Sequence, residues 1–198
     1  ITKKIKKAKK NQSKNIKIEN GRISFYVMVI LTSIASVFLF YLFITHQYQY
    51  KYVYGYSSND LPLGFLISSF WAGQEGSFLF WTLLNAWLGI LYLKTSKQYE
   101  PYGMFLFSII QAFFLVILIK ASPFTTYSQI PPDGSGLNPL LQNFWMVIHP
   151  PVLFIGYSAA AFPFVLAISS LLRRDFDGWI KHALPWTAFT SLTLGAGI

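Results

Sequence analysis

The apolar residues of this chain fall in long uninterrupted blocks, and these restrict the fold more than any other feature. The first block, Ile23–Thr45, is long enough to cross the roughly 30 Å hydrocarbon core of a bilayer as a helix. It exceeds the apolar core of a signal peptide, and no small-residue cleavage site follows it. We therefore predict an all-α integral membrane protein with about five transmembrane helices, the last incomplete. The expected spans are 23–45, 63–93, 102–120, 152–172 and 183–198.

Composition supports the same class of protein. Only 12% of the 198 residues are charged, against about 25% in soluble domains, and 54% are hydrophobic. The absence of cysteine excludes disulfides, thiolate metal sites, a cysteine nucleophile and the Cys-x-x-Cys-His haem attachment motif on this chain. Because the sequence begins with Ile1 and ends on an apolar run, we expect it to be a piece of a longer protein.

Lysine and arginine are concentrated on one side of the membrane if the spans alternate in direction. Residues 1–22, 94–101 and 173–182 hold 14 of the 16. Basic loops stay in the cytoplasm, so we expect the 121–150 loop to be extracytoplasmic. The predicted location is a bacterial inner membrane with that loop in the periplasm, and a mitochondrial inner membrane would orient the chain in the same way. We interpret 1–22 as a solvated basic loop beside the membrane and not as a nucleic-acid-binding arm.

The 63–93 block contains an acid, Glu75, within the string FWAGQEGSFLFW. A carboxyl inside an apolar segment is costly, and it points to function or to a water-filled cavity. Glycines on either side of it permit a break in the helix or the close approach of a ligand. We predict that Leu63–Trp71 dips into the outer leaflet, continuous with or hinged to a spanning helix over Ser77–Leu93. The alternative is one helix that continues out of the membrane, with Glu75 wetted at its outer end.

His149 is the only histidine flanked by two long apolar runs. Pro150 disfavours helical backbone at the residue before it, while Pro150 and Pro151 are able to open a helix. We therefore predict that His149 occupies an extended corner at the end of a structured 121–150 loop, just outside a helix that starts at Val152. An imidazole held in this way suits a ligand, although the residues alone favour a non-ligand role.

A tyrosine-rich loop, His46–Pro62, links the first two apolar blocks. Five of its residues between positions 48 and 56 are tyrosines, and amphipathic rings of this kind are typical of a membrane interface. We interpret His46 as an interfacial side chain and not as a ligand.

Four strings of this sequence resemble the CcmF/NrfE haem lyases of cytochrome c maturation. They are FW-GQEGS (70–77), SPF (122–124), PPDGSGLNPLLQ (131–142) and IHPP-L-F-GY (148–157). The resemblance covers most of residues 60–198. The family has a tryptophan-rich periplasmic segment of the form W-G-x-x-W-x-W-D, which is expected to begin just after residue 198. This sequence is therefore similar to an early part of such a protein.

The resemblance implies a haem site. Two extracytoplasmic histidines of the family are axial ligands of haem iron, and His149 occupies the first position, whereas its partner lies downstream of this chain. Nothing is carried over to His46 or His182. The implied cofactor is haem b, with Trp145 and Phe154, together with Phe144 and Val152, as walls of its pocket. For Glu75 we expect proton handling or pairing with a haem propionate.

The implied function is that of a cytochrome c-type biogenesis protein that binds haem at the extracytoplasmic face and takes part in its covalent attachment to apocytochrome c. The expected partners are apocytochrome c, a haem-delivery chaperone, a thiol-reducing protein and membrane lipid. We do not expect this chain to act as a holocytochrome c synthase by itself. Two alternatives stay open, namely a component of a haem transporter or exporter and a structural subunit of a membrane assembly complex. The sequence does not separate a general maturation protein from a paralogue dedicated to one cytochrome.

Overall fold

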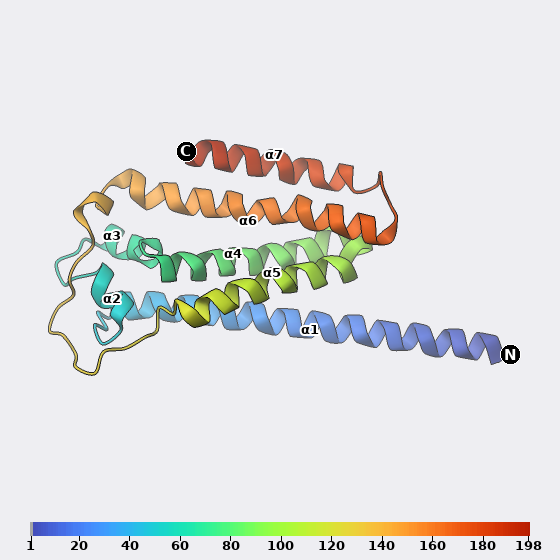
Figure 1. Ribbon diagram of the computed structural model, residues 1–198, viewed down its shortest axis with the longest axis horizontal. Helices are drawn as coiled ribbons and strands as arrows, with labels where there is room; N and C mark the ends of the chain where they lie inside the picture. Colours follow the sequence, from blue (N-terminus) through green and yellow to red (C-terminus); the bar gives the residue numbers. More distant parts are fainter. Residues whose placement is uncertain (1) are drawn as a thin grey trace.

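The chain folds into a bundle of long helices that lie side by side (Figure 1). The computed structural model describes the backbone of residues 2–198 and the side chains of residues 12, 13, 15, 16 and 18–198. In chain order the elements are α1 (Thr2–Ile44), α2 (Lys51–Tyr56), α3 (Leu63–Ser68), η1 (Ser69–Trp71), α4 (Gln74–Thr95), η2 (Lys97–Tyr99), α5 (Glu100–Lys120), η3 (Pro139–Leu141), α6 (Phe144–Arg173) and α7 (Ile180–Gly197).

Four helical segments of the described chain are long and apolar enough to cross a membrane, which makes this an all-α, multi-pass membrane protein. They are Ile18–Ile44, Gln74–Thr95, Lys97–Lys120 and Phe144–Arg173. The last helix, α7, packs against α6 but is not among them, so a fifth span stays a prediction. Figure 1 shows α4 in the centre of the bundle, with α1 on one side and α6 on the other.

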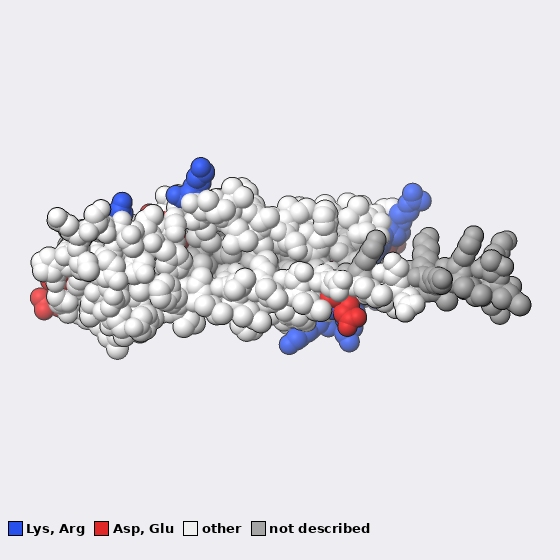
Figure 2. Space-filling model, turned by 90° about the horizontal axis from the view of Figure 1, so that it is seen from below, with Lys and Arg blue, Asp and Glu red and all other residues white. Residues whose placement is uncertain are grey.

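The two ends of the bundle differ in chemistry. At one end lie the segments 45–62 and 121–143, and we call this the loop end (Figure 1). At the other end, which we call the basic end, Arg22 meets Glu100, and Gln98 meets His182. On the face shown in Figure 2 the charged side chains gather toward the two ends and leave an uncharged band between them. Such a band is the surface that lipid tails require.

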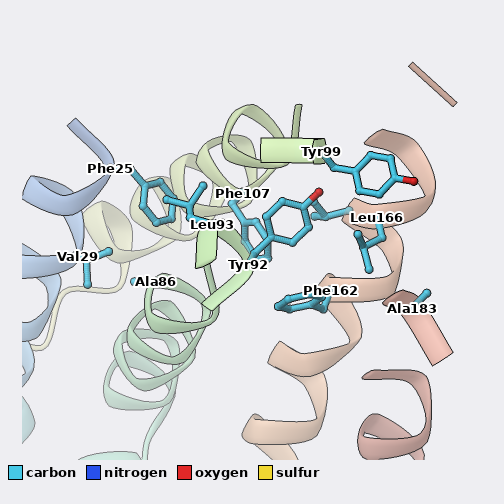
Figure 3. Packing of buried hydrophobic residues seen from close by; sticks show 11 residues of the cluster. Phe25, Val29, Ala86, Tyr92, Leu93, Tyr99, Phe107, Phe162, Leu166 and Ala183 are labelled. Carbon is cyan, nitrogen blue, oxygen red and sulfur yellow. The ribbon is translucent and has the colours of Figure 1, made fainter. Parts of the chain in front are cut away.

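Large aromatic side chains fill the interior near the basic end. Tyr92 of α4, Phe107 of α5 and Phe162 of α6 meet there (Figure 3). The ring of Phe162 also stacks on Trp186 of α7, with 3.8 Å between ring centroids. A second apolar cluster lies at the loop end and combines the end of α1 with α2, α3 and Phe70 of η1. Each end of the bundle therefore has its own core.

The start of the chain corrects one expectation. We expected residues 1–22 to form a solvated basic loop, but α1 begins at Thr2 and continues without interruption into the first span. Lysine has a high helix propensity, so a basic sequence does not oppose extension of a membrane helix into solvent. The side chains of all eight lysines in this segment lie outside the described residues, as does Ile1.

The start of α6 corrects another. We expected an extended backbone at His149 and a helix from Val152, but α6 begins at Phe144 and includes His149, Pro150 and Pro151. The side chain of Asn143 accepts a hydrogen bond of 3.0 Å from the backbone N–H of Trp145, and this N-cap starts the helix. The two prolines remove two helical hydrogen bonds without ending the helix, and its first turns stand at an angle to the rest in Figure 1.

Candidate functional site

The two loops at the loop end are joined into one cap by hydrogen bonds between residues far apart in the sequence. Most of these bonds run from backbone to backbone, so they hold the path of the chain and not only its side chains. The backbone bonds are Lys51 N to Thr125 O, Tyr127 N to Gln49 O and Ser135 N to Tyr54 O, each 2.8 Å, and Gly136 N to Ser57 O, 3.0 Å. The loop before α6 is therefore a structured platform.

Asp133, within the PPDGSG string, ties the two loops together. Its carboxylate accepts hydrogen bonds from the backbone N–H groups of Asn59, at 2.9 Å, and Gly134, at 2.6 Å. The bond from Asn59 is the main cause that lowers the pKa of Asp133 below its usual value. Gly134 lies so close to Ser57 that a β-carbon there would stand 1.8 Å from the Ser57 carbonyl oxygen. Packing between the two loops therefore explains the residues of the PPDGSG string.

A buried tyrosine of α2 supports the break between η1 and α4. The Tyr52 hydroxyl accepts a bond of 3.0 Å from the Gly73 N–H and lies 3.1–3.3 Å from the carbonyl oxygens of Ser69, Phe70 and Gly73. It therefore supplies partners for backbone groups that lose their helical bonds at the break. Burial raises the pKa of Tyr52 far above its usual value, so the hydroxyl stays protonated.

Other parts of the chain occupy the space beside the glycines of the FWAGQEGS string. A β-carbon on Gly73 would stand 2.3 Å from the Tyr56 ring, and one on Gly76 would stand 1.8 Å from the Phe70 carbonyl oxygen and 2.4 Å from the Tyr52 hydroxyl. The close approach that these glycines predict is thus made by tyrosines of α2 and not by a ligand. The sequence signal that points to this packing is the tyrosine repeat at positions 48–56.

Glu75 lies in the first turn of α4, beside this break. The backbone at Gly73 is extended (φ −116°, ψ 172°), so the hinged form of the 63–93 segment is the one observed and a single continuous helix is excluded. A carboxylate in the first turn interacts favourably with the positive end of the helix dipole. The Glu75 side chain is partly exposed. Burial of the Tyr56 hydroxyl is the main cause that raises the pKa of Tyr56, and the electrostatic effect of Glu75 is the second.

His149 lies in the exposed first turns of α6 and is itself half-buried. Trp145, four residues earlier, is on the same side of the helix and is 71% exposed. Phe144 is 64% exposed, and its ring centroid is 5.6 Å from that of Trp145. The start of α6 therefore presents an imidazole beside a broad uncovered aromatic surface.

Phe154 lies elsewhere. Its ring packs against Phe80 and Trp81 of α4, with centroids 5.9 and 5.8 Å apart. Five positions along a helix correspond to a rotation of about 140°, so Phe154 does not share the side of His149. The structure brings together His149 and Trp145, leaves Phe154 in the packing of α6 on α4, and keeps Glu75 on another helix at the same end of the bundle.

The C-terminal part of α7 reaches the same region. A β-carbon on Gly197 would stand 2.7 Å from a methyl group of Leu153, and one on Gly156 would stand 2.6 Å from Leu194. These glycines let the two helices approach closely, one turn beyond His149. In the part of the chain that the structure describes, no three His, Asp or Glu side chains gather into a metal site.

Comparison with known proteins shows the family to which this chain belongs. Residues 71–195, more than half of the chain, match the model of the family described as "Cytochrome C assembly protein". The chain belongs to the cytochrome C assembly protein family. The matched region begins at Trp71, next to the break before α4, and ends within α7, so it includes the platform, Glu75 and His149.

Individual members of the cytochrome C assembly protein family are also similar to this chain. "Cytochrome c-type biogenesis protein CcmF" of Haemophilus influenzae is 35% identical over 172 residues, which is 82% of this chain and 26% of the relative. "Cytochrome c-type biogenesis protein NrfE" of the same organism is 30% identical over 185 residues, 86% of this chain and 29% of the relative. CcmF of Escherichia coli is 31% identical over 181 residues, 86% of this chain and 28% of the relative.

The chain thus spans about a quarter of the length of the curated relatives it matches. No solved structure matches it. The relatives are named as cytochrome c-type biogenesis proteins, and this supports a role in biogenesis for the region that they share with the chain.

Proposed function

We propose that this chain is the part of a cytochrome c-type biogenesis protein that presents one axial ligand to haem at the loop end of the bundle. The observation that carries the proposal is the uncovered start of α6, where the His149 imidazole stands beside the exposed Trp145 ring. Membership in the cytochrome C assembly protein family supports it.

The residues at the start of α6 fit haem as a ligand. An iron porphyrin requires a neutral imidazole on its axis and apolar surfaces against its faces and edges. His149 supplies the first, while Trp145 and Phe144 supply wide apolar surfaces on the same two turns of helix. The backbone carbonyls of Met146 and Val147 lose their helical partners at Pro150 and Pro151. They are therefore available as acceptors for a ring N–H that orients the imidazole.

In the proposed reaction haem supplies vinyl groups that form thioether bonds with the thiols of an apocytochrome. This chain contains no cysteine, so the thiols belong to the partner protein. The contribution of the chain is to bind and orient: His149 holds one axial position, and the platform of residues 121–143 fixes the start of α6. The same proposal names haem b as the bound haem. It also includes three partner proteins, namely an apocytochrome, a haem-delivery chaperone and a thiol-reducing protein.

The proposal also assigns the loop end to the periplasmic side of a bacterial inner membrane and the basic end to the cytoplasm. The basic end holds Arg22, Lys94, Lys97, Arg173, Arg174 and Lys181, as the positive-inside rule requires for a cytoplasmic face. For Glu75 we retain a propionate or proton-handling role. Glu75→Gln, with unchanged haem content and unchanged yield of c-type cytochrome, would remove that role.

The test is His149→Ala in the full-length protein, purified from membranes and examined by absorption spectroscopy for haem bound per polypeptide. We expect bound haem at this site, and the yield of mature c-type cytochrome, to fall to background. His46→Ala is the matched control, because His46 also lies at the loop end but bonds to Tyr48, 2.9 Å away. Normal haem stoichiometry in the His149→Ala protein would reject the ligand assignment. It would also favour a purely structural subunit.

A further inference from the structure

In the middle of the bundle three buried polar side chains, one from each of α4, α5 and α6, carry an oxygen without a hydrogen-bond partner among the described residues. They are Asn85, Gln111 and Ser158, none more than 1% exposed, and we call them the polar layer. The Asn85 amide nitrogen donates to the Trp81 carbonyl at 3.2 Å, and that of Gln111 to the Thr82 carbonyl at 3.1 Å. Asn85 Oδ1, Gln111 Oε1 and Ser158 Oγ have no hydrogen-bond partner among the described residues.

Aromatic contacts bracket this layer on both sides. On the loop-end side the Trp81 ring of α4 contacts Phe114 of α5 at 4.8 Å and Phe154 of α6 at 5.8 Å between centroids. We call these three rings the outer triad. On the basic-end side the inner triad joins the same helices, with centroid distances of 5.2–6.4 Å. Its members are Tyr92, Phe107 and Phe162.

Helix register places the polar layer between the triads. Each of its members is three or four residues from the outer-triad ring on its own helix, which is about one turn. The members on α5 and α6 are also four residues from the inner-triad ring of their own helix. The member on α4, Asn85, precedes Tyr92 by about two turns. The direct bond from Gln111 to the backbone of α4 confirms that α4 and α5 meet at this level. The three unpaired oxygens therefore lie at about the same height in the bundle.

We propose that the polar layer binds a water molecule that bridges α4, α5 and α6. Two of the three unpaired atoms are amide oxygens, which only accept hydrogen bonds, so their partner must be a donor. One water donates to Asn85 and Gln111 and accepts from the Ser158 hydroxyl, which satisfies all three. Lipid offers no such partner, and an unpaired polar group in an apolar interior costs about 1–3 kcal/mol.

This site is distinct from the proposed haem surface and independent of it. The triads close the layer toward both ends of the bundle, so the water acts as a structural bridge and not as part of a conducting path. The bridge joins α6 to its two neighbours below the prolines. It therefore fixes the height of the regular part of α6 relative to α4, whatever the first turns of α6 bind.

The test uses the full-length protein in lipid nanodiscs, with ¹⁵N-labelled glutamine and water-edited solid-state NMR. Gln111→Leu identifies the Gln111 side-chain signal by its loss. We expect magnetisation transfer from water to this amide, and at least about a twofold reduction of the transfer in Ser158→Ala, where the water loses a hydrogen-bond donor. Ser108→Ala is the matched control, because the exposed Ser108 hydroxyl bonds only to Met104 of its own helix. It is expected to leave the transfer unchanged.

Three results would overturn the proposal. They are no transfer to Gln111 in the unmodified protein, transfer that Ser158→Ala leaves unchanged, and a signal that shifts when sodium is replaced by potassium, since that would identify a bound cation. A thermal measurement is independent of the NMR experiment. Gln111→Leu and Ser158→Ala are each expected to lower the melting temperature by about 3 °C, and the double variant by less than their sum. Strict additivity would count against a shared water.

Discussion

The loop end and the basic end of the bundle are stabilised by different means. At the basic end Arg22 pairs through two nitrogens with the buried Glu100 carboxylate, and Tyr99 donates a bond of 2.6 Å to Asp175. At the loop end neutral groups predominate: backbone amides join the two loops, and the Tyr52 hydroxyl supports the break before α4. Charges connect the helices at one end, while close backbone packing connects them at the other.

The exposure of α6 also differs between the two ends of the bundle. Near the basic end the core covers the inward side of α6, and Phe162 is 0% exposed. At the loop end the first turns of the same helix are left open, and Trp145 is 71% exposed. The apolar cluster that joins the end of α1 with α2 and α3 is nevertheless well packed, so the uncovered start of α6 lies at the same end as a packed core. A rigid base beside an uncovered helix start is a suitable arrangement for holding a large planar ligand.

The largest effect is expected from a glycine of the loop end. In Gly76→Ala the new methyl group would overlap the Phe70 carbonyl oxygen and the Tyr52 hydroxyl, so η1 must move. We expect a loss of about 3 kcal/mol or more of stability, measured by thermal unfolding in detergent. Gly55→Ala in α2 is the matched control, because nothing lies within 4 Å of its β-carbon position. Equal melting temperatures for the two variants would refute close packing at the break.

The second prediction concerns the basic end. Arg22→Met leaves the buried Glu100 carboxylate without its partner, and we expect about 2 kcal/mol of destabilisation, which is less than for a fully buried pair because the Arg22 side chain is 48% exposed. Adding Glu100→Gln is expected to restore most of the stability, because an amide is cheaper to bury than an unpaired carboxylate. Unfolding of the two variants, compared in the same detergent, tests this order. A double variant as unstable as Arg22→Met would show that the pair is not what holds α1 to α5.

A smaller effect is expected when the Tyr52 hydroxyl alone is removed. Tyr52→Phe keeps the ring but leaves the Gly73 N–H without this partner, at a cost of about 1–2 kcal/mol. The change is also expected to speed hydrogen exchange of the Gly73 amide, which mass spectrometry or NMR would follow. Tyr54→Phe, in the same short helix, serves as the comparison. Unaltered exchange at Gly73 would mean that another group supports the break.

The smallest effect concerns pH. The pKa of Asp133 is lowered in the folded protein, so its contribution to stability is complete above the unfolded-state pKa of about 3.9 and is lost as pH falls through the lower folded value. We expect the melting temperature to drop as the pH falls below about 4, and the drop to be shallower in Asp133→Asn. Asp175, whose pKa is lowered chiefly by the Tyr99 hydroxyl, contributes the same dependence at the basic end. Identical pH profiles for the unmodified protein and Asp133→Asn would exclude Asp133 as a source.

Much of the fold could be predicted from the apolar blocks and from the glycines. Block length predicts helices that the structure confirms as candidate spans, and Gly73 marks the observed break. The residues that pack against these glycines could not be predicted, because Tyr52 lies 21 residues earlier and meets Gly73 only after the chain turns back. The predicted start of α6 was wrong, because the general effect of proline on the preceding residue is overridden here by a helix that starts at the Asn143 cap and continues through both prolines.

The candidate site was predictable only in part. His149 stood out because of its flanking sequence, and its location at the end that carries the loops agrees with the alternation of spans. Phe154 was chosen as a pocket wall from an assumed corner at His149. Once the helix is continuous through the prolines, the rotation of about 140° between these positions sends Phe154 toward α4. The difference in backbone conformation thus changes which aromatic residue lies on the same side of α6 as His149.

The Tyr52 bonds also bear on the order in which the protein is assembled. They span 17–21 residues, whereas the bonds that join the two loops span 74–81. Short chain closures lose less entropy and form sooner than long ones. During synthesis we therefore expect the break before α4 to be set while α5 is still being made, with the platform closing over it afterwards. Early protection of the 51–76 region from protease in ribosome-bound chains that end before α5 would be the sign of this order.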